Sequence, residues 1–289
     1  MTTPEEGAAH RLTASPTSEH STLTEPAKQL DPETDRRPNP NGFQQWVALT
    51  GRTLKTMVKS GELAIALIAP LIFTIGFYLP LKFVMGLQGI DYAQFLMPII
   101  VLQAMAFTAI SASQLASREA QTGLTTRLKT MPVLGPVPLI SRMTSGLVRS
   151  TLSLAAALGY GYIIGFRFSA GLLQAALFCS LALAISLAFA MGADAIGTLS
   201  KSPEATAQAL TLPQLILGML STGFVPETGF PEWIRPFVRN QPISQFASAM
   251  RDMTEGGVTA SALFPALAWC VGLIAVFAPL GVWASMRRQ

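Results

Sequence analysis

Residues 63–81 read LAIALIAPLIFTIGFYLPL and contain no Asp, Glu, Lys or Arg. A helix needs about 20 mostly apolar residues to cross a hydrocarbon layer about 30 Å thick, and this stretch is close to that length. Because a charge at the centre of a membrane helix costs about 2.5–3.5 kcal/mol, long uncharged runs indicate membrane insertion. Five more uncharged runs follow: 92–117, 150–166, 168–193, 205–226 and 256–286. The predicted transmembrane helices are 61–83, 93–117, 140–165, 169–196, 203–226 and 258–285.

The composition agrees with an all-α integral membrane protein of six transmembrane helices. Half of the 289 residues are hydrophobic and only 12% are charged, whereas charged residues make up about 25% of ordinary soluble domains. The alternative is a large soluble protein with buried core helices. It is disfavoured because so few charges cannot cover the surface of a globule.

Two segments precede the first span. Residues 1–42 hold six of the 20 prolines and almost no large apolar side chains, so we expect a disordered cytoplasmic tail. Residues 43–60 have helical periodicity, with Arg52, Lys55 and Lys59 away from an apolar face. That face holds Phe43, Trp46, Val47, Leu54, Met57 and Val58. This pattern predicts an amphipathic interfacial helix on the membrane surface, a packed cytoplasmic helix being the alternative. The six-span domain then occupies residues 61–289.

The basic residues predict the orientation of the chain. Cytoplasmic loops carry an excess of Lys and Arg, and this excess sets which ends of the helices stay inside. With both termini in the cytoplasm, the inner segments hold Arg36, Arg37, Arg52, Lys55, Lys59, Arg118, Arg127, Lys129, Arg142, Lys201, Arg287 and Arg288. The outer segments then keep Lys82, Arg167, Arg235, Arg239 and Arg251. We therefore expect a multi-pass protein of the plasma (inner) membrane.

The sequence offers no catalytic or metal-binding signature. The two histidines, His10 and His20, lie near the amino terminus, and both cysteines fall inside predicted spans. A metal site, a catalytic dyad in the membrane and a disulfide framework are therefore not indicated. The run GLTTRLKT at 123–130 superficially matches a phosphate-binding loop, but Leu128 stands where that motif requires glycine. The chain is therefore not expected to be an enzyme or to bind ATP, Mg²⁺ or another cofactor.

Two connecting segments carry most of the functional information. After the second span, a short charged helix is predicted from Arg118 to Lys129, and its amphipathic form favours docking to a partner protein. The segment 223–257 is too apolar for a solvated loop. We predict a re-entrant outer helical hairpin here, before the last span and backed by protein. Its second helix begins at Pro242 and places on one face Ile243, Phe246, Ala247 and Met250.

Small residues within the spans predict close helix packing. Gly161 with Gly165, and Ala188 with Gly192, have the four-residue spacing that lets two membrane helices approach closely. Such pairs are common in Ala- and Gly-rich spans, so we interpret them as packing positions.

At this point the sequence resembles the type-2 ABC export permeases. The run Arg118-Glu119 through Gly123, Arg127-Leu128 and Pro132 is similar to the coupling segment of that family. The outer run is similar to its re-entrant signature, through Pro231-Glu232-Trp233-Ile234, Asn240-Gln241-Pro242-Ile243 and Arg251. GFRF at 165–168 and FVRNQPISQF at 237–246 resemble the DrrB/DrrC branch, associated with daunorubicin resistance and complex-lipid export. The resemblance covers residues 43–289.

The resemblance implies a permease subunit of an ABC exporter. Two such subunits, alike or related, would pair, each on a separate ATP-binding ABC subunit that holds the ATP and Mg²⁺. It implies that the coupling contact is made by Glu119, Gly123, Arg127 and Leu128, and that the outer signature includes Trp233, Asn240, Pro242 and Arg251. The cargo would be a lipid or an amphipathic drug, and nothing indicates nucleic acid.

An ion-coupled secondary transporter of a hydrophobic solute is the alternative. That class buries ionisable residues near the membrane midplane. Here the candidates are Arg149 and Asp194, which we expect toward the cytoplasmic ends of their spans, reaching out to the interface. With no polar site expected at the midplane, the sequence favours a cargo taken from the bilayer.

Overall fold

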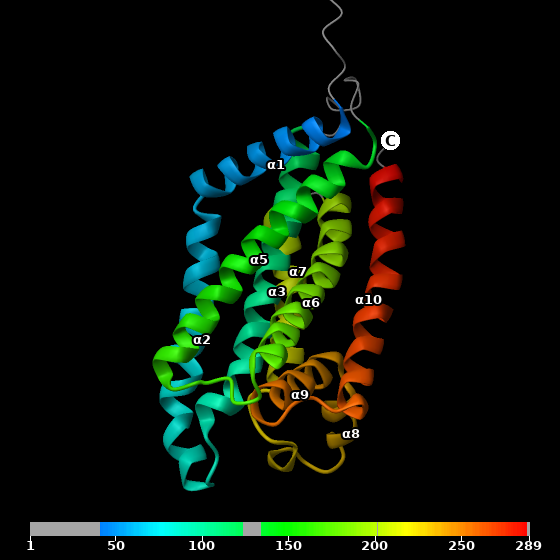
Figure 1. Cartoon of the computed structure of the whole chain (residues 1–289). Helices are drawn as coiled ribbons and strands as arrows, with labels where there is room; N and C mark the ends of the chain where they lie inside the picture. Colours follow the sequence, from blue (N-terminus) through cyan, green and yellow to red (C-terminus); the bar gives the residue numbers. More distant parts are fainter. Residues whose placement is uncertain (1–40, 124–133, 201, 288–289) are drawn as a thin grey trace, which may run out of the picture. The chain divides into compact units, whose positions relative to one another are not determined.

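The computed structural model describes residues 41–123, 134–200 and 202–287 (Figure 1). The predicted tail, 1–42, lies outside these ranges apart from its last two residues. Within them every regular element is a helix, which confirms the all-α prediction. The helices are α1 (Gly42–Lys59), α2 (Glu62–Leu87), α3 (Tyr92–Gln121), α5 (Val137–Ile164), α6 (Leu172–Leu199), α7 (Pro203–Met219), η1 (Glu227–Gly229), α8 (Arg235–Asn240), α9 (Pro242–Glu255) and α10 (Ala260–Arg287).

Five of the helices in the described ranges are long and apolar enough to cross a membrane, namely α2, α3, α5, α6 and α10. They confirm a multi-pass membrane protein. The expected span at 203–226 contains α7, which is 17 residues long and ends at Met219. Its crossing therefore stays a prediction.

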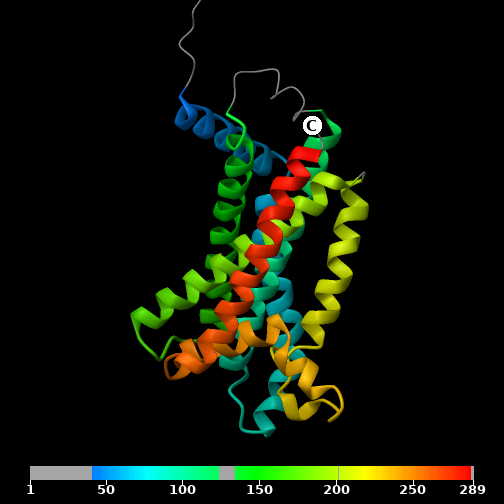
Figure 2. The same cartoon turned by 90° about the vertical axis from the view of Figure 1, so that its right-hand side faces the viewer.

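The long helices alternate in direction between two ends of the bundle (Figure 1). The helix α1 lies across one end, where α10 also finishes, whereas η1, α8 and α9 gather at the opposite end (Figures 1 and 2). The central helix is α3, which packs on α2, α5, α6, α7 and α9 and is buried along most of its length. This arrangement brings the ends of α3, α5 and α6 together near α1.

The outer helices present apolar rows to their surroundings. On α2, exposed side chains recur at helical spacing: Ile65, Ile68, Ile72, Ile75 and Leu79. A soluble protein rarely leaves so large an apolar row uncovered, whereas lipid covers it in a membrane. The exposed rows therefore agree with membrane insertion.

The predicted small-residue pairs play two different roles. A Cβ at Gly161 would lie 2.5 Å from Met97 Sδ, and one at Gly192 would lie 2.7 Å from Phe277 Cδ2. Both glycines therefore permit close packing, as expected. Gly165 does not: its φ of 110° ends α5 in the left-handed region, and a Cβ there would meet nothing within 4 Å. Its role is to terminate the helix.

Candidate functional site

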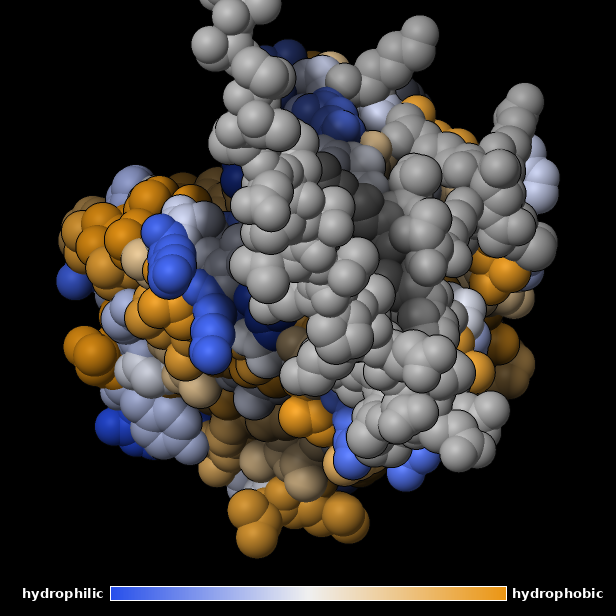
Figure 3. All heavy atoms as spheres, turned by 90° about the horizontal axis from the view of Figure 1, so that it is seen from above, coloured by the Kyte–Doolittle hydropathy of each residue, from blue (hydrophilic) through white to orange (hydrophobic). Residues whose placement is uncertain are grey.

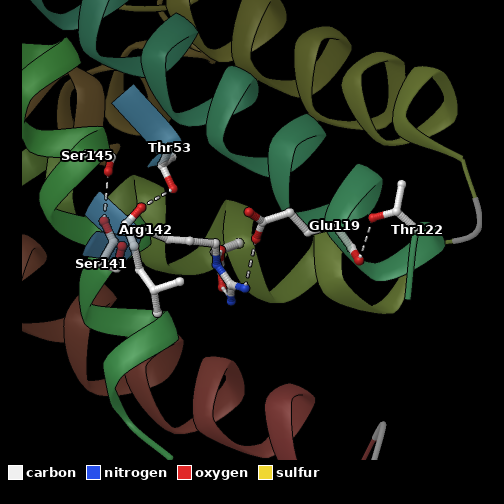
Figure 4. A network of polar contacts seen from close by, with 8 residues as sticks. Thr53, Glu119, Thr122, Ser141, Arg142 and Ser145 are labelled. Atoms are coloured by element: carbon white, nitrogen blue, oxygen red, sulfur yellow. Dashed lines mark hydrogen bonds and ion pairs between the residues drawn. The ribbon is translucent and has the colours of Figure 1, made fainter. Parts of the chain in front are cut away.

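The last turn of α3 holds Glu119 next to a partly buried arginine of α5. Arg142 Nη1 lies 3.4 Å from Glu119 Oε2, and Figure 4 shows the arginine extending across to that carboxylate. The other edge of the guanidinium meets Asp194 of α6, with Nε 2.9 Å from Oδ1 and Nη2 donating to Oδ2 at 3.0 Å. One hydrogen bond, from Nη2, and the ion-pair distance from Nε hold the flat guanidinium against the Asp194 carboxylate. One arginine thus ties together the ends of three helices.

Burial makes this Glu119–Arg142–Asp194 triad hard to break. The side chains are 18%, 13% and 2% exposed, in that order. Two carboxylates share one guanidinium, so removing Arg142 would leave two close negative charges with little water to solvate them. Asp194 does not reach out to the interface as expected, because its carboxylate turns inward to Arg142.

Two of the four predicted coupling residues are described by the structure. Glu119 faces Arg142, and Gly123 follows the end of α3 with a left-handed φ of 66°, a conformation that favours glycine. Arg127 and Leu128 lie outside the described residues. The coupling segment therefore leaves α3 directly beside the triad, and its contact with an ATPase stays a prediction.

The helix α1 is docked on α5 through polar side chains. Trp46 Nε1 donates to Thr144 Oγ1 at 3.1 Å, and Thr50 Oγ1 donates to Ser141 Oγ at 3.2 Å. The predicted apolar face contributes Met57 to the buried side. Other members of that face, together with the basic residues, point away from the bundle: Phe43, Val47, Val58, Arg52 and Lys55. Figure 3 looks onto this end and shows hydrophilic side chains directly beside hydrophobic ones on its left-hand side.

At the opposite end of the bundle, the residue that precedes α9 is hydrogen-bonded to the end of α7. Pro242 occupies the first turn of α9. The preceding Gln241 donates through Nε2 to the carbonyl oxygens of Leu217, at 3.2 Å, and Leu220. Helix ends leave such carbonyls without partners, so Gln241 caps α7. The sequence gives no sign of this role, because it depends on which helix lies next to α9. The predicted face of α9 packs inward, with Phe246, Ala247 and Met250 fully buried and Ile243 partly so.

Arg251 connects α9 to the centre of the bundle. Its Nη2 donates to Phe95 O at 3.3 Å and to Thr222 O at 3.2 Å, and its guanidinium lies 3.9 Å from the centre of the Phe95 ring. Desolvation lowers the pKa of Arg251 to about 10, so this side chain remains charged at neutral pH.

The other two predicted outer residues do not join this contact. Trp233 is 80% exposed, and Asn240 donates through Nδ2 to Pro236 O, at 2.8 Å, within α8. The signature therefore divides into a partly buried pair, Pro242 and Arg251, and an exposed pair, Trp233 and Asn240.

A second buried charge lies near the middle of α5. Arg149 is 1% exposed. Its Nη1 lies 3.0 Å from Glu62 Oε2, and its Nη2 donates to Thr108 O at 2.5 Å. The hydroxyl of Thr108 lies 3.0 Å from that of Ser150, which in turn lies 2.6 Å from that of Ser186.

This arrangement corrects two expectations about Arg149 and its surroundings. The residue lies near the helix middle and is paired, so it neither sits toward the helix end nor reaches out to an interface. A polar cluster occupies the middle of three spans, where none was expected. Periodicity along one helix could not reveal the cluster, because its members come from α3, α5 and α6.

No group of three or more His, Cys, Asp or Glu side chains within the described ranges is placed to hold a metal ion. Cys179 and Cys270 are free thiols. The described site therefore consists of ion pairs and hydrogen bonds that join neighbouring helices.

Comparison with known proteins agrees with this architecture. Residues 87–283 match the model of the ABC-2 family transporter protein. The doxorubicin resistance ABC transporter permease protein DrrB of Mycobacterium tuberculosis is 36% identical over 261 residues, which cover 86% of this chain and 90% of the relative. The probable permease DrrC of that organism is 34% identical over 166 residues, 57% of this chain and 60% of its own. The daunorubicin resistance permease DrrB1 of Streptomyces coeruleorubidus is 27% identical over 194 residues, 66% and 67% of the two chains. With its helical bundle, its five long apolar helices and a family match over most of its length, the chain belongs to the ABC-2 transporter family, as a membrane permease component.

Proposed function

We propose that this chain is the permease subunit of an ABC exporter that moves a hydrophobic or amphipathic cargo outward. ATP hydrolysis occurs in a separate ATP-binding subunit, which holds the ATP and Mg²⁺. Two observations support the proposal. The Glu119–Arg142–Asp194 triad lies where the predicted coupling segment leaves α3, and the chain matches the family model. The similarity to resistance permeases supports a drug-like amphiphile, with a lipid as the second possibility.

The triad gives the proposal a mechanical basis. The segment between α3 and α5 leaves one helix beside Glu119 and returns to the helix that bears Arg142. Because both side chains and Asp194 are joined by charge-assisted contacts in a poorly hydrated place, the three helix ends move as a unit. A pull on residues 119–128 by a closing ATPase would therefore act on α3, α5 and α6 together.

The membrane arrangement proposed here has six crossings and both termini in the cytoplasm, in the inner membrane. The 17 residues of α7 span about 25 Å at about 1.5 Å per residue, somewhat less than a hydrocarbon layer of about 30 Å. The turn at 220–226 and the re-entrant helices α8 and α9 complete that crossing at the outer side. The helix α1 lies in the inner interface, with its exposed apolar side chains toward lipid and Arg52 and Lys55 toward the headgroups.

A second permease subunit is expected to complete the pathway. Within the described ranges α7 packs mainly on α3 and leaves one side exposed, including Leu212, Ile216 and Met219. Such a face is suited to a neighbouring subunit as well as to lipid.

The alternative of ion-coupled transport finds less support. Arg149 is enclosed by Glu62 and a backbone carbonyl, which leaves it paired inside the bundle. Coupling to an ion requires a titratable group that exchanges with water during the cycle.

The decisive test is reconstitution of the chain in vesicles with and without its cognate ABC ATPase. The chain alone should hydrolyse no more ATP than empty vesicles. The pair should hydrolyse ATP and accumulate an amphipathic cargo, and both activities should stop when the phosphate-loop lysine of the ATPase is replaced. Hydrolysis by the chain alone, or transport driven by an ion gradient without ATP, would overturn the proposal.

Coupling is tested best at Arg127. Reversing Glu119 would place a cation against Arg142 and disturb the fold itself. Arg127→Glu should instead reduce recovery of the ATPase or the transport per ATP hydrolysed, with Arg288→Glu as a control of equal charge change. Equal behaviour of the two variants would remove Arg127 from the contact.

A further inference from the structure

The hairpin formed by α2 and α3 extends past the end of α5. The hydroxyl of Tyr78 donates to the carbonyl oxygen of Ile164, the last residue of α5, at 3.2 Å. From Tyr78 the helix α2 continues to Leu87, and Figure 1 shows the turn between α2 and α3 lying beyond the loop that joins α5 to α6. In the membrane arrangement proposed above, this overhang projects from the hydrocarbon layer into the outer headgroup layer.

The tyrosines mark the same level of the bundle. The chain has four tyrosines, and all lie near this end of α2, α3 and α5: Tyr78, Tyr92, Tyr160 and Tyr162. Tyrosine is enriched where membrane helices meet the headgroups, because its ring is apolar and its hydroxyl is polar. Beyond this level Phe83 and Leu87 are 73% and 75% exposed. The overhang thus offers an apolar surface to lipid directly beside the membrane–water boundary.

A groove of about 420 Å³ opens on this overhang. Of the described residues that line it, only Lys82 of α2 and Asp91, which precedes α3, are charged. The rings of Tyr78 and Tyr92 form part of its wall and are stacked, with their centres 6.4 Å apart. Small-molecule sites typically measure about 300–1,000 Å³, so the groove has room for a polar headgroup.

Both charges are available to a ligand. Neither Lys82 nor Asp91 belongs to an ion pair with another described residue. The ammonium of Lys82 lies over the Tyr78 ring, 5.5 Å from its centre. Asp91 Oδ1 accepts hydrogen bonds from the backbone nitrogens of Ala93, at 3.1 Å, and Gln94, at 3.4 Å. These bonds hold the carboxylate at the start of α3, while its other oxygen, Oδ2, can take a further donor.

We infer that the groove binds the headgroup of a phospholipid that carries a phosphate and a primary ammonium, the phosphatidylethanolamine class. Lys82 pairs with the phosphate, and Asp91 Oδ2 accepts a hydrogen bond from the ammonium. One positive and one negative side chain match the two charges of this headgroup. The exposed Phe83 and Leu87 lie beside the groove, where the acyl chains can cover them.

Two other common headgroups fit the groove less well. Phosphatidylglycerol carries only a negative charge, which would meet the like charge of Asp91. Phosphatidylcholine carries a quaternary ammonium, which has no N–H to donate to a carboxylate. A quaternary ammonium is instead recognised by the open faces of aromatic rings, and here the Tyr78 ring is covered by Lys82. The charge pattern therefore favours the ethanolamine headgroup.

The test is photo-crosslinking of the full chain in nanodiscs of phosphatidylcholine. The probe is a trace of phosphatidylethanolamine with a photoreactive group on one acyl chain, and the cross-linked positions are mapped by peptide mass spectrometry. We expect cross-links on α2 between Tyr78 and Leu87. Replacing part of the host lipid by unlabelled phosphatidylethanolamine should suppress them at a mole fraction about 2- to 5-fold lower than replacement by phosphatidylglycerol.

Variants separate the charges from the shape of the groove. Lys82→Gln and Asp91→Asn each remove one charge and should lower the yield of these cross-links about 2- to 5-fold. Asparagine caps a helix as well as aspartate does, so the second variant keeps the start of α3. Gly86→Leu places a side chain in the groove, because a Cβ at this position meets nothing within 4 Å, and should abolish the cross-links. Gly76→Leu, at another exposed and open glycine of α2, is the matched control and should behave like the wild type.

Thermal unfolding in detergent shows which variants are folded, and if Gly86→Leu is not, the two charge variants decide. Equal suppression by the two competing lipids, or wild-type yields in both charge variants, would overturn the headgroup site. The inference goes beyond the proposed function and uses no ATP hydrolysis or transport, so its failure would leave the export function intact. The export function fails by a different result, the absence of ATP-driven transport by the chain with its ATPase.

Discussion

Arg149 shows how much a single buried charge depends on its partner. It is 1% exposed and paired with Glu62 at 3.0 Å. Glu62→Gln leaves the guanidinium buried beside a neutral group, which should destabilise the protein by about 3–5 kcal/mol. The expected result is a lower thermal unfolding temperature in detergent. Glu62→Gln combined with Arg149→Met should recover part of that loss, and an unchanged unfolding temperature for Glu62→Gln alone would contradict a structural ion pair.

Single residues were also where the sequence was least informative. The spacing of Trp46 and Met57 correctly predicted a helix, and Pro242 correctly marked the start of α9. The sequence did not reveal which side chains pair with each other, because paired residues such as Arg142 and Asp194 are 52 positions apart in the chain. Local periodicity identifies which residues share a helix face, whereas pairing depends on which helices become neighbours.

At the scale of helices, the packing of α3 against α6 depends on Gly197. A Cβ at this position would lie 2.1 Å from the backbone oxygen of Ser113, and backbone cannot move aside as a flexible side chain can. Gly197→Ala should therefore push the two helices apart and destabilise the fold by about 1–3 kcal/mol. Gly146→Ala is the matched control, because nothing lies within 4 Å of its added Cβ, and alanine favours a helix by about 1 kcal/mol. Thermal unfolding of both variants distinguishes them, and equal stability would argue against the close approach.

Long apolar helices are the elements that sequence predicts best. Hydropathy placed five of them within a few residues of their observed bounds, because lipid imposes one length and one composition on every span. The helix α7 departs from this rule. It ends at Met219 rather than continuing to 226. Gln241, which belongs to another element, caps it by donating to the carbonyl oxygens of Leu217 and Leu220.

For the whole molecule, the testable property is its topology. With six crossings, a cysteine introduced at 228 should react with a membrane-impermeant thiol reagent in intact cells. Cysteines at 20, 125 and 289 should react only after the membrane is permeabilised. Labelling of 20 and 289 together in intact cells would reverse the proposed orientation, whereas labelling of 289 but not of 20 or 228 would remove the crossing by α7.

The docking of α1 has a consequence for how the chain is made. Its partners on α5, Thr144 and Ser141, follow Trp46 and Thr50 by 98 and 91 positions. At about 5–20 residues per second, a ribosome needs roughly 5–20 s to reach them. During that interval the nascent α1 helix cannot pack on α5, because Ser141 and Thr144 have not yet been synthesised. The side chains that docking never uses, Phe43, Val47 and Val58, can hold it on the bilayer surface while it waits. The interfacial placement proposed for α1 would thus give this helix two successive attachments, first to lipid and then to protein, separated by the order of synthesis.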